Sequence, residues 1–316
     1  MTHKVFIDGE AGTTGLQIRA RLEGRRDLEL IRLPDDRRKD TAARAGALNA
    51  ADAVILCLPD DAAREAVALI GNDSTRVIDA STAHRTAEGW TYGLPEMGQG
   101  HRAQIAASRR VSNPGCYPTG FIALVRPLVH AGLIPTGWPL TVNAVSGYSG
   151  GGKSMIAEFE DMDSPAYTSA AFRIYATALG HKHAPEMRQH SGLSHAPVFA
   201  PAVGRYAQGM IVEVPLQLWA IPGAPTLASI QTTLERAYEG ERFVEVATAE
   251  EARATRTVDP EALNGTNRMK LYAFGDEAAG QARLVAVLDN LGKGASGAAV
   301  QNLNLMLGLD EAAGLQ

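Results

Sequence analysis

The chain has 316 residues, 45% hydrophobic and 21% charged, a globular composition with enough apolar residues for two packed domains. A formal net charge of −5 argues against a nucleic-acid-binding surface, and the opening residues contain no apolar stretch long enough for a signal peptide or a membrane span. Two cysteines provide neither a disulfide framework nor zinc-ligand spacing. We therefore expect a soluble cytoplasmic protein with free thiols and no bound metal.

The first part of the chain alternates short apolar segments with helical patterns, which is typical of βαβ units around a parallel sheet. The predicted strands are Lys4–Asp8, Leu28–Leu33, Ala53–Leu58, Arg76–Ala80, Trp90–Leu94 and Arg109–Ser112. The predicted helices are Thr13–Glu23, Thr41–Asn49 and Asp60–Ile70. We expect residues 1–115 to form a Rossmann-like, doubly wound α/β domain.

A glycine-rich turn with GxxGxxG spacing follows the first predicted strand directly. This spacing alone is weak evidence, but a strand, a glycine turn and a helix in that order create an amide-lined site for a dinucleotide pyrophosphate. A tight structural turn is the alternative. The residues that we predict to bind the cofactor here are Gly9, Gly12, Thr13, Thr14 and Gly15.

The end of the second strand is where a Rossmann fold contacts the adenosine ribose. Arg32, Arg37 and Arg38 are suited to pair with the 2′-phosphate of NADP. Asp35 and Asp36 would instead accept hydrogen bonds from the ribose hydroxyl of NAD. The arginines favour NADP, so residues 1–115 are predicted to be an NADP-binding domain. NAD binding and a solvated charged loop stay open as alternatives.

Cys116 immediately precedes an apolar segment with helical spacing, in the sequence Ser112-Asn113-Pro114-Gly115-Cys116-Tyr117-Pro118-Thr119-Gly120. Unpaired amides and the helix dipole stabilise a thiolate at a helix N-terminus, so we expect the pKa of this thiol to fall below its free value of about 8.5. Cys116 is thus a candidate nucleophile, and a buried structural cysteine is the alternative. Cys57, inside an apolar strand, is expected to be a core residue.

Longer strands follow, predicted at Leu140–Val145, Gly209–Trp219, Arg242–Ala247, Arg268–Phe274 and Ala282–Leu288. Their partial alternation indicates a sheet with one face covered by helices, including Leu227–Glu239. We expect residues 116–290 to form an α+β catalytic and dimerisation domain with a mixed sheet. Residues 291–316 are expected to return to the first domain, through a helix predicted at Lys293–Leu309.

A thiolate combined with a hydride cofactor indicates aldehyde or acyl-phosphate redox chemistry through a thioester. This chemistry needs a proton donor for the departing oxygen, and the segment from Gly180 to Glu186 contains two histidines, a lysine and a glutamate. We predict that His181 or His183 is the acid, held by Glu186; the sequence does not distinguish between the two imidazoles. His101, His130 and His195 have no such neighbours and are expected to be surface or core residues.

A second glycine-rich segment, from Val145 to Ser154, follows a predicted strand. Its glycines are suited to expose amides to a phosphate or carboxylate, with Lys153 supplying positive charge. A flexible hairpin is the alternative. The segment also matches a GxxxxGK[ST] nucleotide motif, but a second nucleotide site would leave Cys116 and the first glycine turn without a role.

Three segments together resemble the N-acetyl-gamma-glutamyl-phosphate reductases, of the compact second type. They are the Cys116 segment, His181–Glu186 and the terminal Asn290-Leu291-Gly292-Lys293-Gly294-Ala295-Ser296-Gly297. Further matches are Leu58–Ala62 and Asp79–Arg85, so the resemblance spans nearly the whole chain. It implies NADPH-dependent reductive dephosphorylation of N-acetyl-γ-glutamyl phosphate to N-acetyl-L-glutamate 5-semialdehyde and phosphate, a step of arginine biosynthesis.

The resemblance also implies roles for further residues. Ser81 and Gly294 would contact the cofactor. The residues assigned to the substrate are Asn113, Ser146, Gly147, Lys153, Lys182 and Arg85. The glycine turn differs from the Gly-Ala-Ser-Gly-Tyr-Thr-Gly of longer members by carrying Glu10, Ala11 and Thr13.

Two other functions stay open. An aspartate-semialdehyde dehydrogenase-like enzyme shares the cysteine chemistry, but we would then expect a glutamine soon after the cysteine, where this chain has Tyr117-Pro118-Thr119. A non-catalytic NADP-sensing Rossmann protein is the alternative from a different class. We expect a small-molecule substrate and a homo-oligomer, either a dimer or a tetramer.

Overall fold

The computed structural model describes residues 2–316, and the chain divides into two compact units. The first unit contains the chain up to Pro95 together with Gln99–Gly115 and Ala295–Gln316. The second contains Glu96–Gly98 and Cys116–Gly294. Each unit is therefore built from segments that are separated in the sequence.

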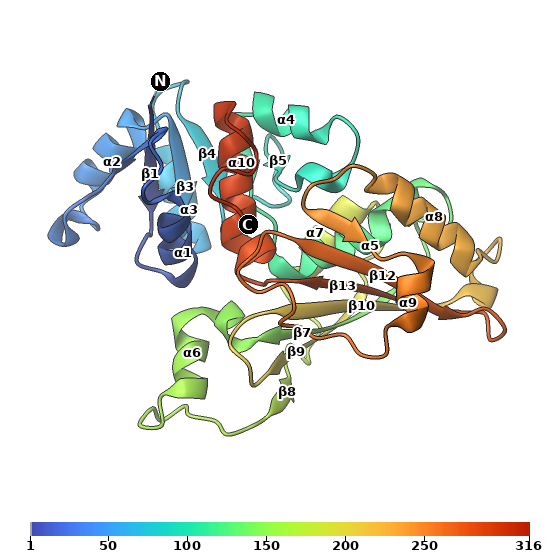
Figure 1. Cartoon of the computed structure of the whole chain (residues 1–316). Helices are drawn as coiled ribbons and strands as arrows, with labels where there is room; N and C mark the ends of the chain where they lie inside the picture. Colours follow the sequence, from blue (N-terminus) through green and yellow to red (C-terminus); the bar gives the residue numbers. More distant parts are fainter. Residues whose placement is uncertain (1) are drawn as a thin grey trace. The chain divides into compact units, whose positions relative to one another are not determined.

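The first unit is built around a six-stranded sheet in which every neighbouring pair is parallel. Its strands are β1 (His3–Asp8), β2 (Leu28–Ile31), β3 (Ala53–Leu56), β4 (Arg76–Asp79), β5 (Thr91–Tyr92) and β6 (Arg110–Ser112), in the order β2-β1-β3-β4-β6-β5 (Figure 1). The predicted doubly wound sheet is confirmed, although the strand predicted at Trp90–Leu94 has only two residues.

Helices cover both faces of this sheet. Successive side chains of a strand point to opposite faces, and here both sets are apolar, so each face needs a covering layer. The helices are α1 (Thr13–Leu22), α2 (Thr41–Ala50), α3 (Asp60–Ala68), α4 (His101–Ala107) and α10 (Gly297–Leu307). On β1, Val5 and Ile7 pack in the core with residues of α1 and α10. Phe6 points the other way, into a core shared with α2 and α3. Such burial on both faces explains why these strands are continuously apolar.

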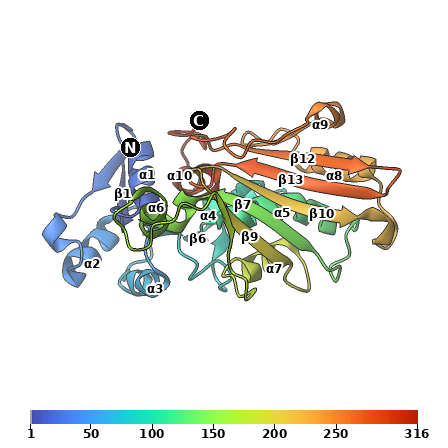
Figure 2. The ribbon, with the colours of Figure 1, turned by 90° about the horizontal axis from the view of Figure 1, so that it is seen from below.

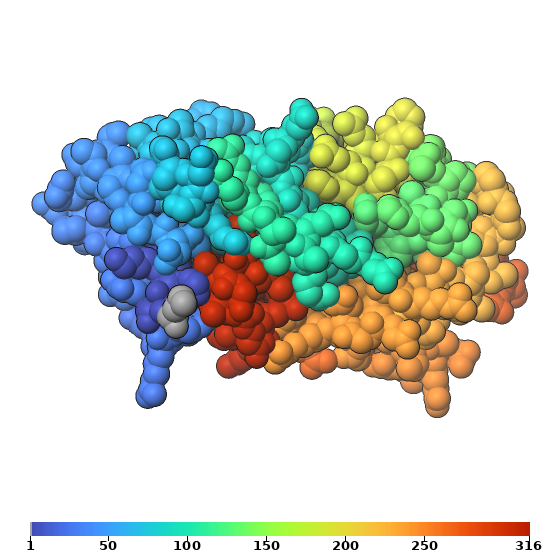
Figure 3. Space-filling view, turned by 90° about the horizontal axis from the view of Figure 1, so that it is seen from above, coloured from blue at the N-terminus to red at the C-terminus, as the bar shows by residue number. Residues whose placement is uncertain are grey.

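The last helix of the chain completes the first core. Val300, Leu303 and Met306 of α10 are buried in the same cluster as Val5, and α10 contacts α1, α4 and β4. In the space-filling view the C-terminal residues, coloured red, lie against the blue N-terminal and teal α4 segments (Figure 3). The regular helix begins later than predicted, because Gly292–Ser296 form a π-helical turn, η5.

The second unit contains a seven-stranded mixed sheet. Its strands are β7 (Thr141–Gly147), β8 (Phe172–Ile174), β9 (Val198–Gly204), β10 (Met210–Gln217), β11 (Val244–Val246), β12 (Met269–Asp276) and β13 (Gln281–Leu288), in the order β11-β12-β13-β10-β7-β9-β8. Figure 2 shows the run from β12 through β13, β10 and β7 to β9. Antiparallel β10 and β13 pair with Met210 opposite Leu288. The predicted mixed sheet is confirmed, but β8 and β9 were not predicted, since β8 is short and Pro201 interrupts the strand pattern of β9.

Helices cover one face of the second sheet, as predicted. They are α5 (Cys116–His130), which contacts β10 and β13, α8 (Leu227–Ala237), which contacts β12, and α7 (Ala184–Ser191), which contacts α5. The shorter α9 (Ala249–Ala254) contacts β12, and α6 (Gly152–Glu160) follows the turn η3 (Tyr148–Gly151) after β7. Along β10 and β12, buried residues alternate with half-buried or exposed ones, so the opposite face is partly open to solvent. Among residues 2–316, no helix has the length and apolar character to cross a bilayer.

Candidate active site

The glycine turn after β1 lies where the strand order of the first sheet reverses. The chain passes from β1 to β2 on one side and then to β3 on the other, and ligands of doubly wound sheets bind at this point. Gly9 has a φ of +88°, and a Cβ there would lie 2.3 Å from the carbonyl oxygen of Cys57, after β3. Only glycine fits this close approach. The turn leads to Gly12, the N-cap of α1. Because glycine has no side chain, no side-chain hydrogen bond caps the first amides of this helix.

A cavity of about 550 Å³ opens beside this turn. Of the residues predicted to bind the cofactor, Gly9, Arg32 and Arg38 line it, together with Glu10, Asp35 and Asp36. The other predicted residues of the turn, Gly12, Thr13, Thr14 and Gly15, lie at the start of α1 and are not lining residues. Lys39 adds a cation that the sequence analysis did not assign. Arg37 is not a lining residue; its guanidinium lies 3.5 Å from Asp40.

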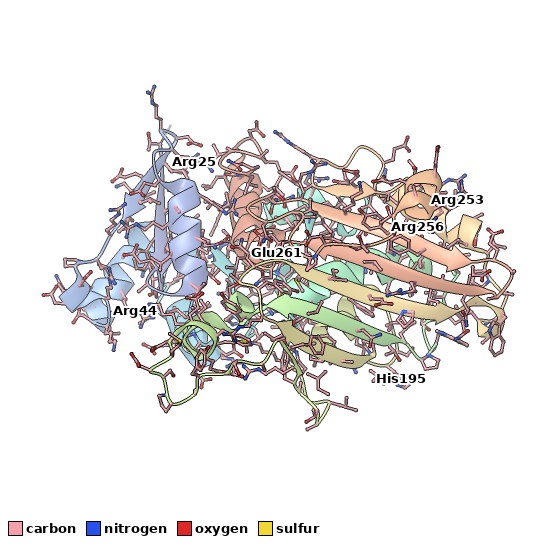
Figure 4. The ribbon with its side chains drawn as sticks, turned by 60° about the horizontal axis from the view of Figure 1, so that its bottom comes forward. Arg25, Arg44, His195, Arg253, Arg256 and Glu261 are labelled. Atoms are coloured by element: carbon pink, nitrogen blue, oxygen red, sulfur yellow. The ribbon has the colours of Figure 1, made fainter. Side chains whose placement is uncertain are left out.

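Two ion-pair clusters set the charge of this cavity. Arg38 lies 2.6 Å from the Asp35 carboxylate and 3.4 Å from that of Glu10, so it links the β2 end to the glycine turn. Arg44 on α2 (Figure 4) lies 2.9 Å from the buried Asp8 carboxylate at the end of β1. The Asp8 charge is thus balanced beside the proposed phosphate site. Cations at the β2 end and a glycine turn with close backbone approach fit a dinucleotide with an extra phosphate.

Ser81 is held by a fully buried carboxylate. The Ser81 hydroxyl donates to Asp79 Oδ2 at 2.8 Å, and its amide donates to Oδ1 at 2.9 Å. His84 Nδ1 lies 2.6 Å from the same carboxylate, and its ring stacks on Trp90. The carboxylate therefore fixes the segment from Ser81 to His84 at the end of β4.

Arg85 and Asn113 support the segment that leads to Cys116. Arg85 is buried, and its guanidinium donates to the carbonyl oxygens of Asn113 at 2.9 Å and Ala80 at 3.1 Å. The Asn113 side chain donates to the Ala295 carbonyl at 2.9 Å and accepts from the Asn302 amide at 3.1 Å. These bonds tie β4, β6 and α10 of the first unit together, a supporting role that sequence reasoning missed.

Cys116 is the first residue of α5 and lines a cavity of about 240 Å³ in the second unit. The predicted residues that share this lining are Ser146, Gly147, His181, Lys182 and His183. Lys153 is exposed in the first turn of α6 and is not a lining residue, and Glu186 is buried on α7. The flexible-hairpin alternative for the glycine-rich segment is wrong, because Tyr148–Gly151 and Gly152–Glu160 are helical.

The two histidines of this cavity are in contact. Their ring centroids lie 4.7 Å apart, and the backbone amide of His183 donates to His181 Nδ1 at 3.1 Å. Burial, followed by the charge of Lys182, lowers the pKa of His181 to about 4. His181 is therefore neutral at pH 7 and, with Nδ1 accepting, carries its proton on Nε2. By contrast, His195 lies on an exposed loop before β9 (Figure 4).

Two tyrosines complete the cavity wall and were not predicted. The Tyr175 hydroxyl donates to the Tyr117 hydroxyl at 3.1 Å, and Tyr117 donates to the Ala202 carbonyl at 3.3 Å. Burial raises the pKa of Tyr175 to about 12, so the phenol is protonated. Tyr117 is adjacent to Cys116 in sequence, a signal that could have identified it, whereas nothing in the sequence marks Tyr175.

The other cysteine has a different environment. Cys57 packs against the first core, and burial, together with the charges of Asp79 and Asp8, raises the pKa of its thiol to about 12. It is a protonated thiol at the edge of this core, only partly buried where a buried core residue was predicted. Within the described residues, no group of three or more histidine, cysteine, aspartate or glutamate side chains is arranged to hold a metal ion.

Comparison with known families agrees with this two-unit architecture. Residues 36–106 match the semialdehyde dehydrogenase NAD binding domain, and residues 116–290 match the semialdehyde dehydrogenase dimerisation domain. The chain is 54% identical over 318 aligned residues to N-acetyl-gamma-glutamyl-phosphate reductase 2 of Nostoc sp., covering 99% of each chain. It is 56% identical over 309 residues to N-acetyl-gamma-glutamyl-phosphate reductase of Brucella ovis, covering 98% of this chain and all of the relative.

The chain belongs to the N-acetyl-gamma-glutamyl-phosphate reductase family. The resemblance inferred from the cysteine, histidine and terminal segments is thereby confirmed over nearly the full length.

Solved structures share the fold of this reductase family member at low identity. Aspartate semialdehyde dehydrogenase II of Vibrio cholerae, complexed with ASA, has a TM-score of 0.70 at 14% identity and covers 97% of this chain and 98% of its own. Aspartate semialdehyde dehydrogenase of Candida albicans with NADP has a TM-score of 0.65 at 13% identity and covers 97% of this chain and 99% of its own. At such identities the likeness concerns the fold alone.

Proposed function

We propose that the chain catalyses the NADPH-dependent reduction of N-acetyl-γ-glutamyl phosphate to N-acetyl-L-glutamate 5-semialdehyde and phosphate, in arginine biosynthesis. The observation that carries this proposal is the cavity in which Cys116, at the start of α5, lies with two contacting histidines. The names of relatives at 54% and 56% identity support the choice of substrate.

Cys116 is the proposed nucleophile. Its sulfur attacks the acyl carbon, the bond from that carbon to the phosphate oxygen breaks, and a thioester forms. When bound, NADPH supplies the hydride that reduces the thioester carbon. The carbon–sulfur bond then breaks, which releases the aldehyde and returns the sulfur to Cys116 as a thiolate.

The two histidines have different proposed roles. His181 is neutral and carries its proton on Nε2, so it is suited to donate a hydrogen bond to the oxygen of the reacting carbonyl. His183 is then the imidazole that gives a proton to the departing phosphate. Glu186, buried one helical turn further on α7, is proposed to hold this segment.

The remaining cavity residues supply anion contacts. Ser146, Gly147 and Lys182 line the wall, so they are the proposed contacts for the phosphate or the carboxylate of the substrate. Lys153, exposed beyond the lining, is proposed as a longer-range cation for the same anion. Arg85 and Asn113 are proposed to act by holding the segment before Cys116.

We propose that residues 1–115 bind NADP, residues 116–290 carry the catalytic and self-association functions, and residues 291–316 return to the cofactor domain. The proposed cofactor contacts are Gly9, Gly12, Thr13, Thr14 and Gly15 at the pyrophosphate, Arg32, Arg38 and Lys39 at the 2′-phosphate, Ser81 and Gly294. Arg37 pairs with Asp40 outside the cavity lining, so we propose that it contributes little to cofactor binding. The three cations that line the cavity at the β2 end, Arg32, Arg38 and Lys39, support NADP over NAD, because they are suited to bind the additional phosphate.

We further propose a cytoplasmic homo-oligomer, a dimer or a tetramer. The partly open face of the second sheet supports this assembly, because Tyr272 and Phe274 stack on it with centroids 5.2 Å apart. The match to a dimerisation domain covers the same sheet. The net charge of −5 supports a protein that does not bind nucleic acid.

The test is a reverse-direction assay of the purified protein. N-acetyl-glutamate semialdehyde or aspartate semialdehyde is supplied with either NADP or NAD, with and without phosphate, and reduced cofactor is followed by absorbance. We expect phosphate-dependent reduction of NADP with the N-acetylated aldehyde. Activity with the aspartyl aldehyde alone would overturn the substrate assignment, and faster reduction of NAD would overturn the cofactor assignment.

A further inference from the structure

The π-helical turn Gly292–Ser296 lies directly against the nucleophile. A Cβ added to Gly294 would lie 2.8 Å from the Cβ and 3.2 Å from the Cα of Cys116. Contacts of 2.8 Å between such atoms require one of them to move, and neither is the end of a flexible side chain. Gly294 has no left-handed φ, so the requirement for glycine at this position comes from space alone.

A buried carboxylate fixes the chain that enters this turn. Asp289 is fully buried, and its two side-chain oxygens accept from the amides of Leu291 and Gly265, each at 2.8 Å. The amide of Gly294 donates to the Asp289 carbonyl at 2.9 Å. Asp289 therefore holds the backbone at Leu291, where the chain enters the turn, and at Gly294, which faces Cys116.

A buried ion pair between Lys293 and Glu96 also holds this turn, through the lysine side chain. Lys293 and Glu96 are 0% and 1% exposed at their side chains, and Nζ lies 2.8 Å from Oε1. A lysine without exposure to water needs such a partner, because an uncompensated buried charge is strongly destabilising. The pair fixes the residue immediately before Gly294, and it belongs to the same compact unit as Cys116.

We propose that the turn Gly292–Ser296 sets the position of the Cys116 side chain, with Gly294 as a positioning residue and the Lys293–Glu96 pair as its anchor. Gly294 acts by leaving the space that the nucleophile occupies. This inference rests on the proposed function for the role of Cys116 as nucleophile, but the contact itself acts on the thiol whether or not substrate is present. The cofactor contact that the sequence predicts for Gly294 is a separate role.

The test compares Gly294→Ala with Gly137→Ala, an exposed glycine of the same unit with no atom near its added Cβ and no left-handed φ. The rate of alkylation by iodoacetamide is measured against pH in each variant, together with NADPH affinity, kcat and KM. For Gly294→Ala we expect a changed apparent thiol pKa and alkylation rate, and kcat reduced about 100-fold, because a displacement of about 1 Å can cost that factor. KM should stay within about threefold, since catalytic geometry rather than uniform binding is lost. The NADPH affinity is measured separately, because it reports on the cofactor contact that the sequence predicts for Gly294. Gly137→Ala should match the unsubstituted protein.

Unchanged alkylation and kcat in a folded Gly294→Ala variant would overturn the proposal. Lost NADPH affinity with unchanged alkylation would assign Gly294 to the cofactor instead. If Gly294→Ala does not fold, Glu96→Gln provides the second arm, because it keeps an oxygen acceptor for Lys293 and removes the charge; normal thiol reactivity in that variant would also overturn the proposal. Alkylation uses neither substrate nor cofactor, so altered alkylation in a protein inactive on the proposed substrate would refute only the proposed function.

Discussion

The two cysteines of this chain have the same side chain and opposite environments. Cys57 packs against the core of the first unit, where burial raises the pKa of its thiol to about 12. Cys116 begins α5 and lines a cavity with His181 and His183. Because only a thiolate is an effective nucleophile, position in the fold decides which cysteine can react.

This difference predicts opposite outcomes for the two cysteines. Cys116→Ser should abolish measurable turnover, because a serine hydroxyl is not ionised at neutral pH, while NADPH still binds with unchanged affinity. Cys57→Ala is the control and should keep turnover within about threefold, at a cost in stability on the order of 1 kcal/mol from the small cavity. Steady-state assays and fluorescence titration with NADPH measure both. Retained turnover in Cys116→Ser would remove that residue from the mechanism.

The lowered pKa of His181 predicts a pH dependence of stability. In the unfolded chain this imidazole takes up a proton near its ordinary pKa of about 6.5, but in the folded protein only near 4. The unfolded state therefore binds more protons between these values, and stability falls as the pH is lowered through this window. Above pH 6.5 the residue contributes no pH dependence, because both states are neutral.

The measurement is thermal unfolding at pH 7 and pH 5 for the unsubstituted protein, His181→Gln and His195→Gln. His181→Gln should lose less Tm on acidification than the unsubstituted protein, by on the order of 2 °C, because solvent around the half-buried ring reduces the effect. The exposed His195 serves as the control, and its variant should behave like the unsubstituted protein. An equal loss of Tm in all three would contradict the lowered pKa.

At the scale of elements, the cofactor cavity depends on how the β2 end meets the glycine turn. Arg38 belongs to this junction through its ion pairs with Asp35 and Glu10. Arg37 is adjacent in sequence but pairs with Asp40 and is not among the residues that line the cavity. The turn η1 (Asp35–Arg37) thus separates two neighbouring arginines that the sequence pattern treats alike.

Arg38→Ala should weaken NADPH binding about 10- to 100-fold, because the loss of a charged hydrogen bond to phosphate costs a binding free energy of that size. Binding of NADH should change little, because it has no 2′-phosphate. Arg37→Ala is the matched control and should change the affinity for NADPH by less than about threefold. Fluorescence titrations with both cofactors decide the matter, and equal losses in the two variants would refute a specific role of Arg38.

Helices and strands with a clear local pattern of apolar residues could be predicted from the sequence, and those without one could not. The strands of the first sheet and the helix α8 were predicted within a few residues, because apolar runs and helical spacing repeat along the chain. The strand β9 was missed because Pro201 interrupts its pattern. The helix α7 was missed because its eight residues contain too few apolar side chains to show helical spacing. The π-helical turn was also missed, because no local spacing distinguishes it from the start of α10.

For the whole molecule, the open face of the second sheet predicts assembly. Tyr272→Asp combined with Phe274→Asp should convert an oligomer to single chains, because two charges would replace a stacked aromatic pair at the contact. Leu16→Asp is the control, since this exposed apolar side chain lies on α1 of the first unit. Light scattering after size-exclusion chromatography measures the mass. An oligomer that survives the double substitution would show that another surface joins the chains.

The glycine turn after β1, the apolar strands, the position of Cys116 before a helix and the family of the chain could all be inferred from local patterns in the amino-acid sequence. These features depend on residues close together in the chain, so their spacing predicts them. Three contacts could be seen only in the folded chain: Tyr175 donates to Tyr117, Arg85 donates to the Asn113 carbonyl, and Gly294 lies against Cys116. Each of these contacts joins residues far apart in the sequence, and packing rather than local periodicity brings them together.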